Sequence, residues 1–249
     1  MPQASVAGNG VVLIPMDYGP ANHICSCRYP TLAGAVVPVF NLLLQDSSGN
    51  PTGTPLTLSR TTLPLIFSGG ITWWNDTRLV VENPLVQLPE ARITLFVRAD
   101  GSGTTEIFTQ ALAKFSSEFK TGIGGSDSCK GADDCNWPAE AQLASGNSGV
   151  SLAVATTPFS IGYVVLGQAI EDNLSTALLI NRAGVAVSAS PTSVSFAVQE
   201  LGGIFSNGRL TADITDPFSS LAWPMSGYTY LIMRSRTPRP STTCSQRNE

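Results

Sequence analysis

Arg98-Ala99-Asp100-Gly101-Ser102-Gly103-Thr104-Thr105 is the stretch of this sequence that says most about its fold. An apolar run at residues 93–97 leads into it and an amphipathic run leads out of it. This pattern predicts a strand, a tight turn and the first turn of a helix. The first turn of a helix has backbone N–H groups without an internal partner, and the positive end of the helix dipole lies there. With its hydroxyls and the planar guanidinium of Arg98, the stretch therefore predicts an anion-binding site.

A second interpretation of the same stretch needs no ligand. Asp100 and Gly101 would form an ordinary turn, and Ser102 or Thr104 would only cap the helix. Arg98 favours the anion site, because a guanidinium at the end of a buried strand needs an anionic partner. We expect Asp100 to hold that guanidinium in place while Arg98 still faces a ligand. The stretch is not a Walker loop, because the pattern GxxxxGK[ST] is absent from the sequence.

Composition narrows the class of protein. The chain has 249 residues, of which 13% are charged and 43% are hydrophobic, and its net charge is −4. These values are typical of a globular, loop-rich α/β protein, and they argue against nucleic-acid binding, which needs a basic patch. The longest apolar stretch, residues 34–44, is too short to span a bilayer. The first residues do not show a signal-peptide pattern, so we expect a cytosolic chain or one that starts after such a leader.

Two of the five cysteines, Cys129 and Cys135, enclose a short polar segment. This spacing favours a disulfide, which would imply an oxidising compartment. Metal binding is the alternative, and it has little support because His23 is the only histidine and the sequence has no CxxC pair. We therefore expect neither a metal site nor a cofactor. We expect Asp133 and Asp134, inside this loop, to lie in a solvent-exposed turn.

Hydrophobic patterning predicts alternating strands and helices, and hence an α/β fold with a mixed sheet. We expect strands at residues 11–16, 92–97, 161–166 and 228–233, a second apolar run at residues 34–44, and helices at residues 58–67, 105–119, 150–155 and 193–205. Residues 46–54 and 122–136 are expected to be loops. From residue 234 the composition shifts to Arg, Pro, Ser and Thr, which predicts a disordered tail over 234–249.

Other chemistry has weaker support. Trp73 and Trp74 could form an aromatic platform for a sugar or choline, but we favour core anchors beside an Asx turn. A Ser-His-Asp hydrolase is poorly supported, because His23 has no matching nucleophile motif and the sequence has no G-x-S-x-G.

Several further motifs share the order seen in one family. They are SGGITWWND at residues 68–76, RADGSGT at 98–104, GNSGV at 146–150, TPFSIGYV at 157–164 and WPMS at 223–226. On these motifs the chain resembles the phosphate-binding proteins of ABC phosphate transporters, from about residue 11 to residue 233. The RADGSGT stretch is the signature of that family.

The resemblance implies a two-lobed periplasmic-binding-protein-like fold of class II, in which ligand is held in the cleft and the lobes close by a hinge. Residues 1–40 and 221–233 would form a partial lobe one, and residues 41–220 would form lobe two. The family has further elements at both ends, so the first lobe is expected to be incomplete. No transmembrane span is expected in this chain.

The resemblance also assigns site residues. Arg98 would pair with phosphate oxygens, Asp100 would orient Arg98, and Ser102, Gly103 and Thr104 would donate from hydroxyl and backbone N–H groups. Asn22 lies where the family has an aspartate that accepts the proton on phosphate and so rejects sulfate. An amide lacks the charge that repels sulfate, so we expect weaker discrimination between the two anions.

These observations predict a non-catalytic protein that binds inorganic phosphate or a similar tetrahedral oxyanion. By resemblance, its partner would be an ABC transporter membrane complex, and its location would be periplasmic, secreted or at the cell surface. One alternative is a degenerate interaction or sensor domain that keeps the fold without tight binding. Another is an enzyme that uses the turn as an oxyanion hole, although no nucleophile–base pair is evident.

Overall fold

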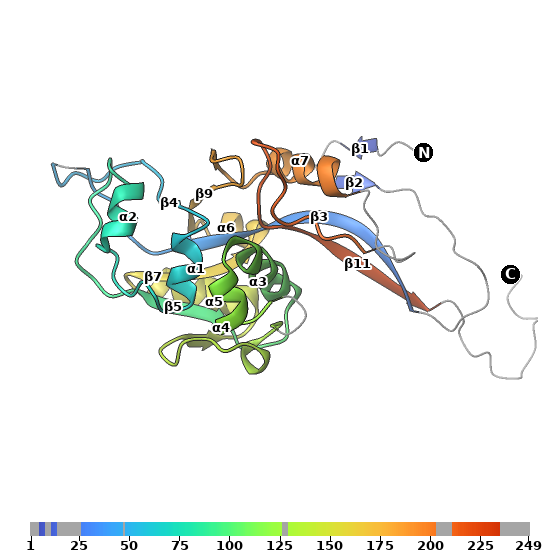
Figure 1. Ribbon diagram of the computed structural model, residues 1–249, viewed down its shortest axis with the longest axis horizontal. Helices are drawn as coiled ribbons and strands as arrows, with labels where there is room; N and C mark the ends of the chain where they lie inside the picture. Colours follow the sequence, from blue (N-terminus) through green and yellow to red (C-terminus); the bar gives the residue numbers. More distant parts are fainter. Residues whose placement is uncertain are drawn as a thin grey trace, which may run out of the picture.

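The computed structural model of the chain describes residues 5–7, 11–13, 26–46, 48–125, 129–202 and 211–234 (Figure 1). Its main sheet has six strands in the order β11-β3-β7-β5-β6, with β8 paired to β3. These strands are β3 (Ser26–Phe40), β5 (Thr94–Arg98), β6 (Gln142–Ala144), β7 (Ser160–Val165), β8 (Ser175–Thr176) and β11 (Ser226–Arg234). The predicted mixed α/β fold is confirmed, because β5 pairs in parallel with β6 and β7 while β3 is antiparallel to β7 and β11.

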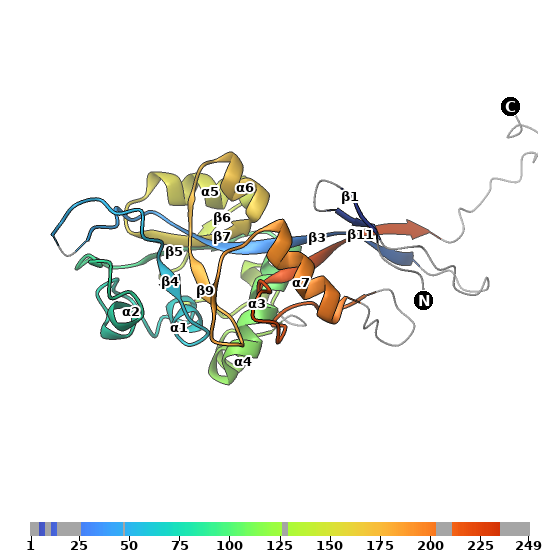
Figure 2. The same cartoon turned by 90° about the horizontal axis from the view of Figure 1, so that it is seen from above.

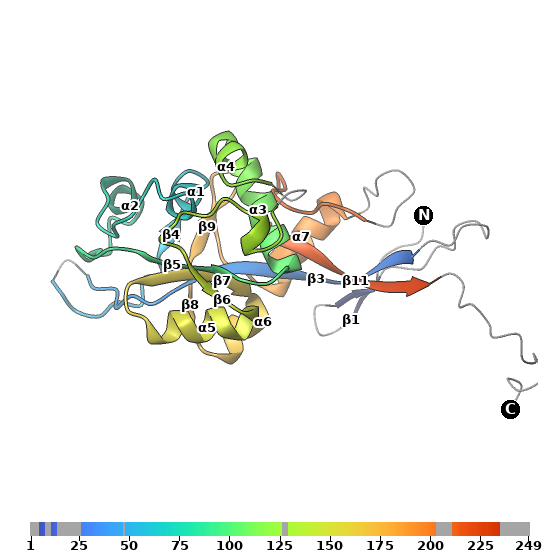
Figure 3. The same cartoon turned by 90° about the horizontal axis from the view of Figure 1, so that it is seen from below.

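Helices cover both faces of this sheet, as Figures 2 and 3 show from opposite sides. The helices α5 (Gly146–Thr156) and α6 (Leu166–Glu171) lie on one face. The other face carries α1 (Thr62–Phe67), α3 (Gly103–Phe115), α4 (Ser117–Gly122) and α7 (Pro191–Leu201), with α2 (Thr77–Glu82) farther along. Strands of a parallel sheet are buried on both faces, which explains why residues 95–98 are all buried.

Two small sheets complete the described structure. A three-stranded sheet joins β4 (Thr57–Leu58), β9 (Leu178–Ile180) and β10 (Ala186–Val187) in the order β10-β9-β4. A separate antiparallel pair consists of β1 (Ser5–Ala7) and β2 (Val11–Leu13). A short 3-10 helix spans Ala132–Asp134.

The long strand β3 links the main body to a projecting two-stranded ribbon (Figure 1). Its inner part, residues 36–40, pairs with β7 in the main sheet, whereas residues 26–35 pair with β11 alone among the described strands. The register of the ribbon shifts between Thr229 and Tyr230. The predicted division into lobes, with a boundary at residue 40, stays a prediction.

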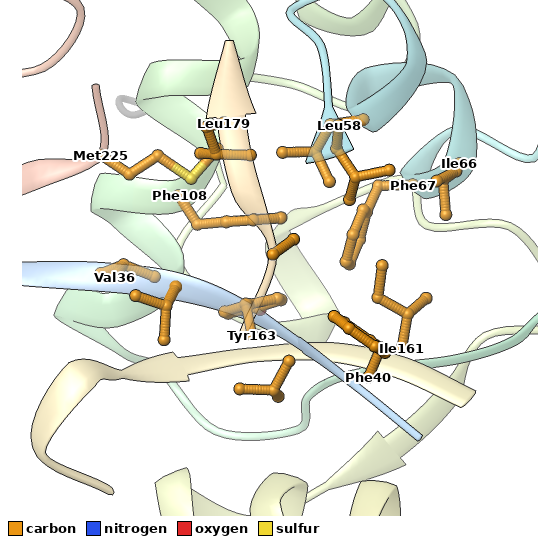
Figure 4. Close-up of a cluster of buried hydrophobic side chains, with 14 of the residues drawn as sticks. Val36, Phe40, Leu58, Ile66, Phe67, Phe108, Ile161, Tyr163, Leu179 and Met225 are labelled. Atoms are coloured by element: carbon orange, nitrogen blue, oxygen red, sulfur yellow. The ribbon is translucent and has the colours of Figure 1, made fainter. Parts of the chain in front are cut away.

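The core extends over both faces of the main sheet, and Figure 4 shows the part that lies against α1 and α3. Phe108 of α3 stacks on Tyr163 of β7, with ring centroids 4.2 Å apart, and meets the edge of Phe67 at 4.7 Å. All three side chains are fully buried. Aromatic pairs of this geometry add to the free energy gained by burying the rings, so these residues fix α1 and α3 against β7.

The boundaries of two predicted helices differ from those in the structure. The helix predicted over 58–67 begins only at Thr62, because residues 57–58 form β4. The helix predicted over 105–119 is two helices: α3 ends at Phe115, and the Ser116 hydroxyl accepts the Phe119 N–H as the N-cap of α4. The predicted strand 11–16 and helix 193–205 correspond to β2 and α7, and parts of both predicted ranges lie outside the described residues. The predicted tail, after Arg234, also lies outside them.

Replacing Phe108 tests the predicted apolar stripe of α3. Phe108→Ala should lower the free energy of unfolding by about 3–5 kcal/mol, because a fully buried ring is removed and a cavity remains. Chemical denaturation of both proteins measures the difference. Leu152→Ala on α5 is the control, since that side chain is 66% exposed and should change stability little. Equal stability of Phe108→Ala and the wild type would contradict the assigned packing.

Candidate anion-binding site

Two helices begin at one edge of the main sheet. The parallel strands β5 and β6 end there at Arg98 and Ala144, which are register partners, and α3 and α5 follow them. In open α/β sheets, ligands bind outside the carboxyl ends of the strands, where helix N-termini meet. The turn between Arg98 and Gly103 lies at this edge, so the sheet topology alone marks it as a candidate site.

Arg98 is the buried charge at the centre of the site. Its side chain is only 8% exposed. Its Nε donates to Asp100 Oδ1 at 2.9 Å and its Nη2 donates to Asp100 Oδ2, so the carboxylate is bound by two parallel hydrogen bonds. Its Nη1 donates to Asn147 Oδ1 at 3.3 Å. A guanidinium carries five N–H groups, so donors remain on the two terminal nitrogens beyond these contacts among the described residues.

The Asp100 carboxylate lies in the turn before α3 and also contacts the N-terminus of α5. Besides binding Arg98, its Oδ1 accepts the backbone N–H of Gly146, the first residue of α5, at 2.8 Å. The Arg98 guanidinium, and next the Gly146 N–H, hold the pKa of the Asp100 carboxyl well below its usual range. Asp100 is therefore ionised at neutral pH, as orientation of a buried arginine requires.

Ser102 is the N-cap of α3. Its Oγ accepts the backbone N–H groups of Thr104 at 3.1 Å and Thr105 at 3.5 Å. The capping interpretation is thus confirmed, but it does not exclude ligand binding, because accepting these bonds leaves the hydroxyl proton of Ser102 to donate. Gly103 is exposed, and its N–H has no hydrogen-bond partner within the described part of the chain. The turn therefore presents hydroxyl, amide and guanidinium donors together.

The Tyr163 side chain of β7 contacts the residues on both sides of the turn, at the end of β5 and in the first turn of α3. Its hydroxyl accepts the Arg98 backbone N–H at 3.3 Å and lies 2.8 Å from Thr105 Oγ1. Burial raises the pKa of this phenol to about 12, so it stays protonated. A neutral hydroxyl between β5 and α3 fixes the angle at which the helix leaves the strand.

The structure brings Arg98, Asp100, Ser102, Gly103 and Thr104 into one turn, whereas Asn22 lies outside the described residues. The expected pairing of Arg98 with Asp100 is confirmed. Sequence reasoning assigned no role to Asn147 or Tyr163. No pattern within one segment indicates that these side chains reach Arg98, because the contacts depend on the pairing of β5 with β6 and with β7.

The other sequence hypotheses have mixed outcomes. The Cys129–Cys135 disulfide is confirmed. Trp74 is a core anchor, as favoured, with its Nε1 bonded to the Phe159 carbonyl at 2.9 Å. The same interpretation was wrong for Trp73, which is 39% exposed and lies against the Arg92 guanidinium. Asp133 and Asp134 are exposed, in a 3-10 turn.

Residues 30–243 match the family described as the PBP superfamily domain. The chain belongs to the PBP superfamily. A phosphate-binding protein PstS from Xylella fastidiosa is 34% identical over 224 residues, which cover 90% of this chain and 57% of that protein. A second, from Haemophilus influenzae, is 33% identical over 219 residues, covering 87% of this chain and 60% of that protein. The chain thus spans little more than half the length of these relatives.

Solved structures share the fold. The phosphate-binding protein from Stenotrophomonas maltophilia superposes with a TM-score of 0.56 at 20% sequence identity. The alignment covers 86% of this chain and 57% of that one. The match agrees with the predicted periplasmic-binding-protein-like class. Among the described residues, no helix has the length and apolar character needed to cross a membrane.

The acid dependence of stability tests the Arg98–Asp100 pair. A carboxyl whose folded pKa is lowered stabilises the protein above its unfolded pKa, near 3.8, and the contribution is lost as pH falls below that value. Wild type should therefore exceed Asp100→Asn in unfolding free energy at neutral pH, by on the order of 1 kcal/mol because Asp100 is partly exposed. The difference should shrink below about pH 4.

Urea unfolding at a series of pH values measures this difference. Asp133→Asn, an exposed carboxyl in the neighbouring loop, is the control and should follow the wild type throughout. A stability difference for Asp100→Asn that stays constant from neutral pH into acid would show that the ion pair does not stabilise the folded state.

Proposed function

We propose that this chain binds inorganic phosphate, or a similar tetrahedral oxyanion, at the turn formed by residues 98–104. The observation that carries the proposal is the buried Arg98 guanidinium, held by Asp100 and Asn147 beside the N-terminus of α3. Relatives that share about a third of their residues with this chain are named as phosphate-binding proteins. The turn supplies the donors that such an anion needs when it leaves water.

The charge balance of the site favours binding through hydrogen bonds. Arg98 and Asp100 neutralise one another, so an entering anion meets no large excess of positive charge. Its charge is stabilised by the remaining guanidinium donors, the Gly103 N–H, the hydroxyls of Ser102 and Thr104, and the positive end of the α3 dipole. Several oriented neutral dipoles can hold an oxyanion in this way without a matching set of cations. Discrimination between phosphate and sulfate is proposed to depend on Asn22.

We infer a binding role rather than catalysis. The Ser102 Oγ already accepts two backbone N–H groups as a helix cap, and the one histidine of the chain, His23, lies outside the described residues. Within the described part of the chain, no side chain is hydrogen-bonded to the Ser102 hydroxyl as the general base of nucleophilic catalysis would be.

We further propose that the chain acts outside the cytoplasm in phosphate uptake, with an ABC transporter membrane complex as its partner. The names of its relatives support phosphate binding, and the transporter is what the resemblance of the sequence to the family implies. The Cys129–Cys135 disulfide supports the compartment, because such bonds persist in oxidising surroundings.

Replacing Arg98 tests the proposed function. Isothermal titration with phosphate should show the largest loss of affinity for Arg98→Ala, since each charge-assisted hydrogen bond contributes about 1.5–3 kcal/mol. Arg98→Lys keeps the charge but loses the planar fork, so its affinity should fall between that of wild type and that of Arg98→Ala. Ser102→Ala and Thr104→Val should each lose less, because each removes one uncharged hydroxyl and leaves the Arg98 guanidinium and the Gly103 N–H in place.

Arg92→Ala is the matched control, because this exposed arginine packs on Trp73 away from the turn. Its phosphate affinity should equal that of the wild type. If Arg98→Ala binds phosphate as tightly as wild type does, the turn is only a helix cap. If the wild type does not bind at all, the chain is a degenerate domain that keeps the fold alone.

A further inference from the structure

We propose that the disulfide loop, residues 129–135, is a positioning element of the anion site: it holds the backbone of residues 100–102 in the conformation that binds phosphate. The proposal rests on the proposed function and deepens it. Nothing in the signature turn itself points to this loop, which lies about thirty residues farther along the chain. Three separate contacts connect the two segments.

The first contact is a hydrogen bond between the backbones of the two segments. The Ser102 N–H donates to the Lys130 carbonyl oxygen at 2.7 Å. Ser102 is the N-cap of α3, so its orientation decides where the first amides of the helix point. Fixing the Ser102 amide therefore fixes the donors that the site presents.

The second contact is a close approach at Gly131. A Cβ added there would lie 2.8 Å from the Asp100 carbonyl oxygen, 3.0 Å from its carbon and 3.1 Å from the Gly101 nitrogen. All three atoms belong to the backbone and cannot move as a flexible side chain would. Gly131 has an extended conformation, with φ −165°, which any residue adopts. Glycine is thus required by the contact with the turn and not by its own dihedral angles.

The third contact anchors the loop to α3. The Thr109 hydroxyl shares its one proton between the Thr105 carbonyl of its own helix, at 2.9 Å, and the Cys129 carbonyl, at 3.1 Å. Both Thr109 and Cys129 are fully buried. The disulfide joins Cys129 to Cys135, which is also buried. Both ends of the loop are therefore fixed in the core. The adjoining Asn136 N–H donates to the Ile123 carbonyl at 3.1 Å, beyond the end of α4. These contacts fix residues 129–135 in the core, and the turn of residues 100–102 packs against them.

This arrangement lowers the cost of ordering the site. The turn contains two exposed glycines, Gly101 and Gly103, and such a turn loses conformational entropy when a ligand immobilises it. Contacts that order it beforehand leave more of the interaction free energy for binding. The alternative is that the disulfide loop only stabilises the fold. The two roles predict different results when the contact is disturbed while the disulfide stays intact.

Gly131→Ala makes that disturbance. With the disulfide intact, its phosphate affinity measured by isothermal titration should fall by about tenfold, because the turn must shift away from the new methyl group. Gly122→Ala in α4 is the matched control, since a Cβ there meets no atom within 4 Å. It should bind phosphate as the wild type does. Melting curves measured alongside confirm that all proteins are folded at the titration temperature.

Reduction of the Cys129–Cys135 disulfide is a second test of the proposal, and it needs no substitution. Wild type treated with a phosphine reductant should lose phosphate affinity and regain it after reoxidation, provided circular dichroism shows that the fold persists. Cys129→Ser with Cys135→Ser repeats the test if reduction unfolds the chain. Unchanged affinity in Gly131→Ala, together with unchanged affinity after loss of the disulfide, would overturn the proposal.

Hydrogen exchange separates this proposal from the proposed function. The Ser102 amide, bonded to Lys130, should exchange slowly in oxidised wild type and faster in Gly131→Ala, whether or not phosphate binds. If wild type and Gly122→Ala both fail to bind phosphate, the proposed function fails, and the exchange rates then decide whether the loop orders the turn. Equal exchange of the Ser102 amide in all proteins would show that it does not.

Discussion

A positive charge buried at the end of a central strand is the constraint on which the rest of this site depends. The Arg98 side chain is almost completely buried, and an unpaired guanidinium there would cost several kcal/mol. Asp100 supplies the counter-charge two residues later, and Asn147 supplies a further acceptor from α5. Both partners must therefore stay in place, and the turn between β5 and α3 has little freedom.

The scaffold supplies this order through its topology. Because β5 and β6 are parallel neighbours, the helices that follow them begin at the same edge of the sheet, on its opposite faces. Asp100 uses this closeness, since its carboxylate binds Arg98 and also accepts the first N–H of α5. Tyr163 of the neighbouring strand β7 binds both β5 and α3. The same carboxylate thus orients the arginine and ties one helix to the turn that starts the other.

Much of this arrangement could be predicted from the sequence, because it is local. The run of apolar residues before Arg98, the glycines of the turn and the stripe through Phe108 specify strand, turn and helix within about twenty residues. Cys129 and Cys135 are likewise separated by only a few positions, and their pairing was predicted correctly. Resemblance to a family added the expected roles of the turn residues, which are consistent with the geometry but remain a proposal.

What could not be predicted depends on contacts between distant segments. Asn147 and Tyr163 reach Arg98 only because three strands become neighbours in the sheet, and no pattern in one segment shows this. The two-residue strand β4 and the short helix α6 are too brief for periodicity to reveal. Trp73 and Trp74 are adjacent and alike, yet Trp74 is buried and Trp73 exposed.

The most direct test of the central claim is a phosphate titration followed by nitrogen-15 NMR of the whole chain. The account predicts progressive shifts of the Gly103 amide and of the Arg98 guanidinium resonances, while the Gly184 amide, in a turn bonded to Asn181, stays unchanged. Shifts confined to other parts of the chain, or saturation with phosphate that leaves Gly103 and Arg98 unmoved, would contradict the claim that the turn after β5 is the binding site.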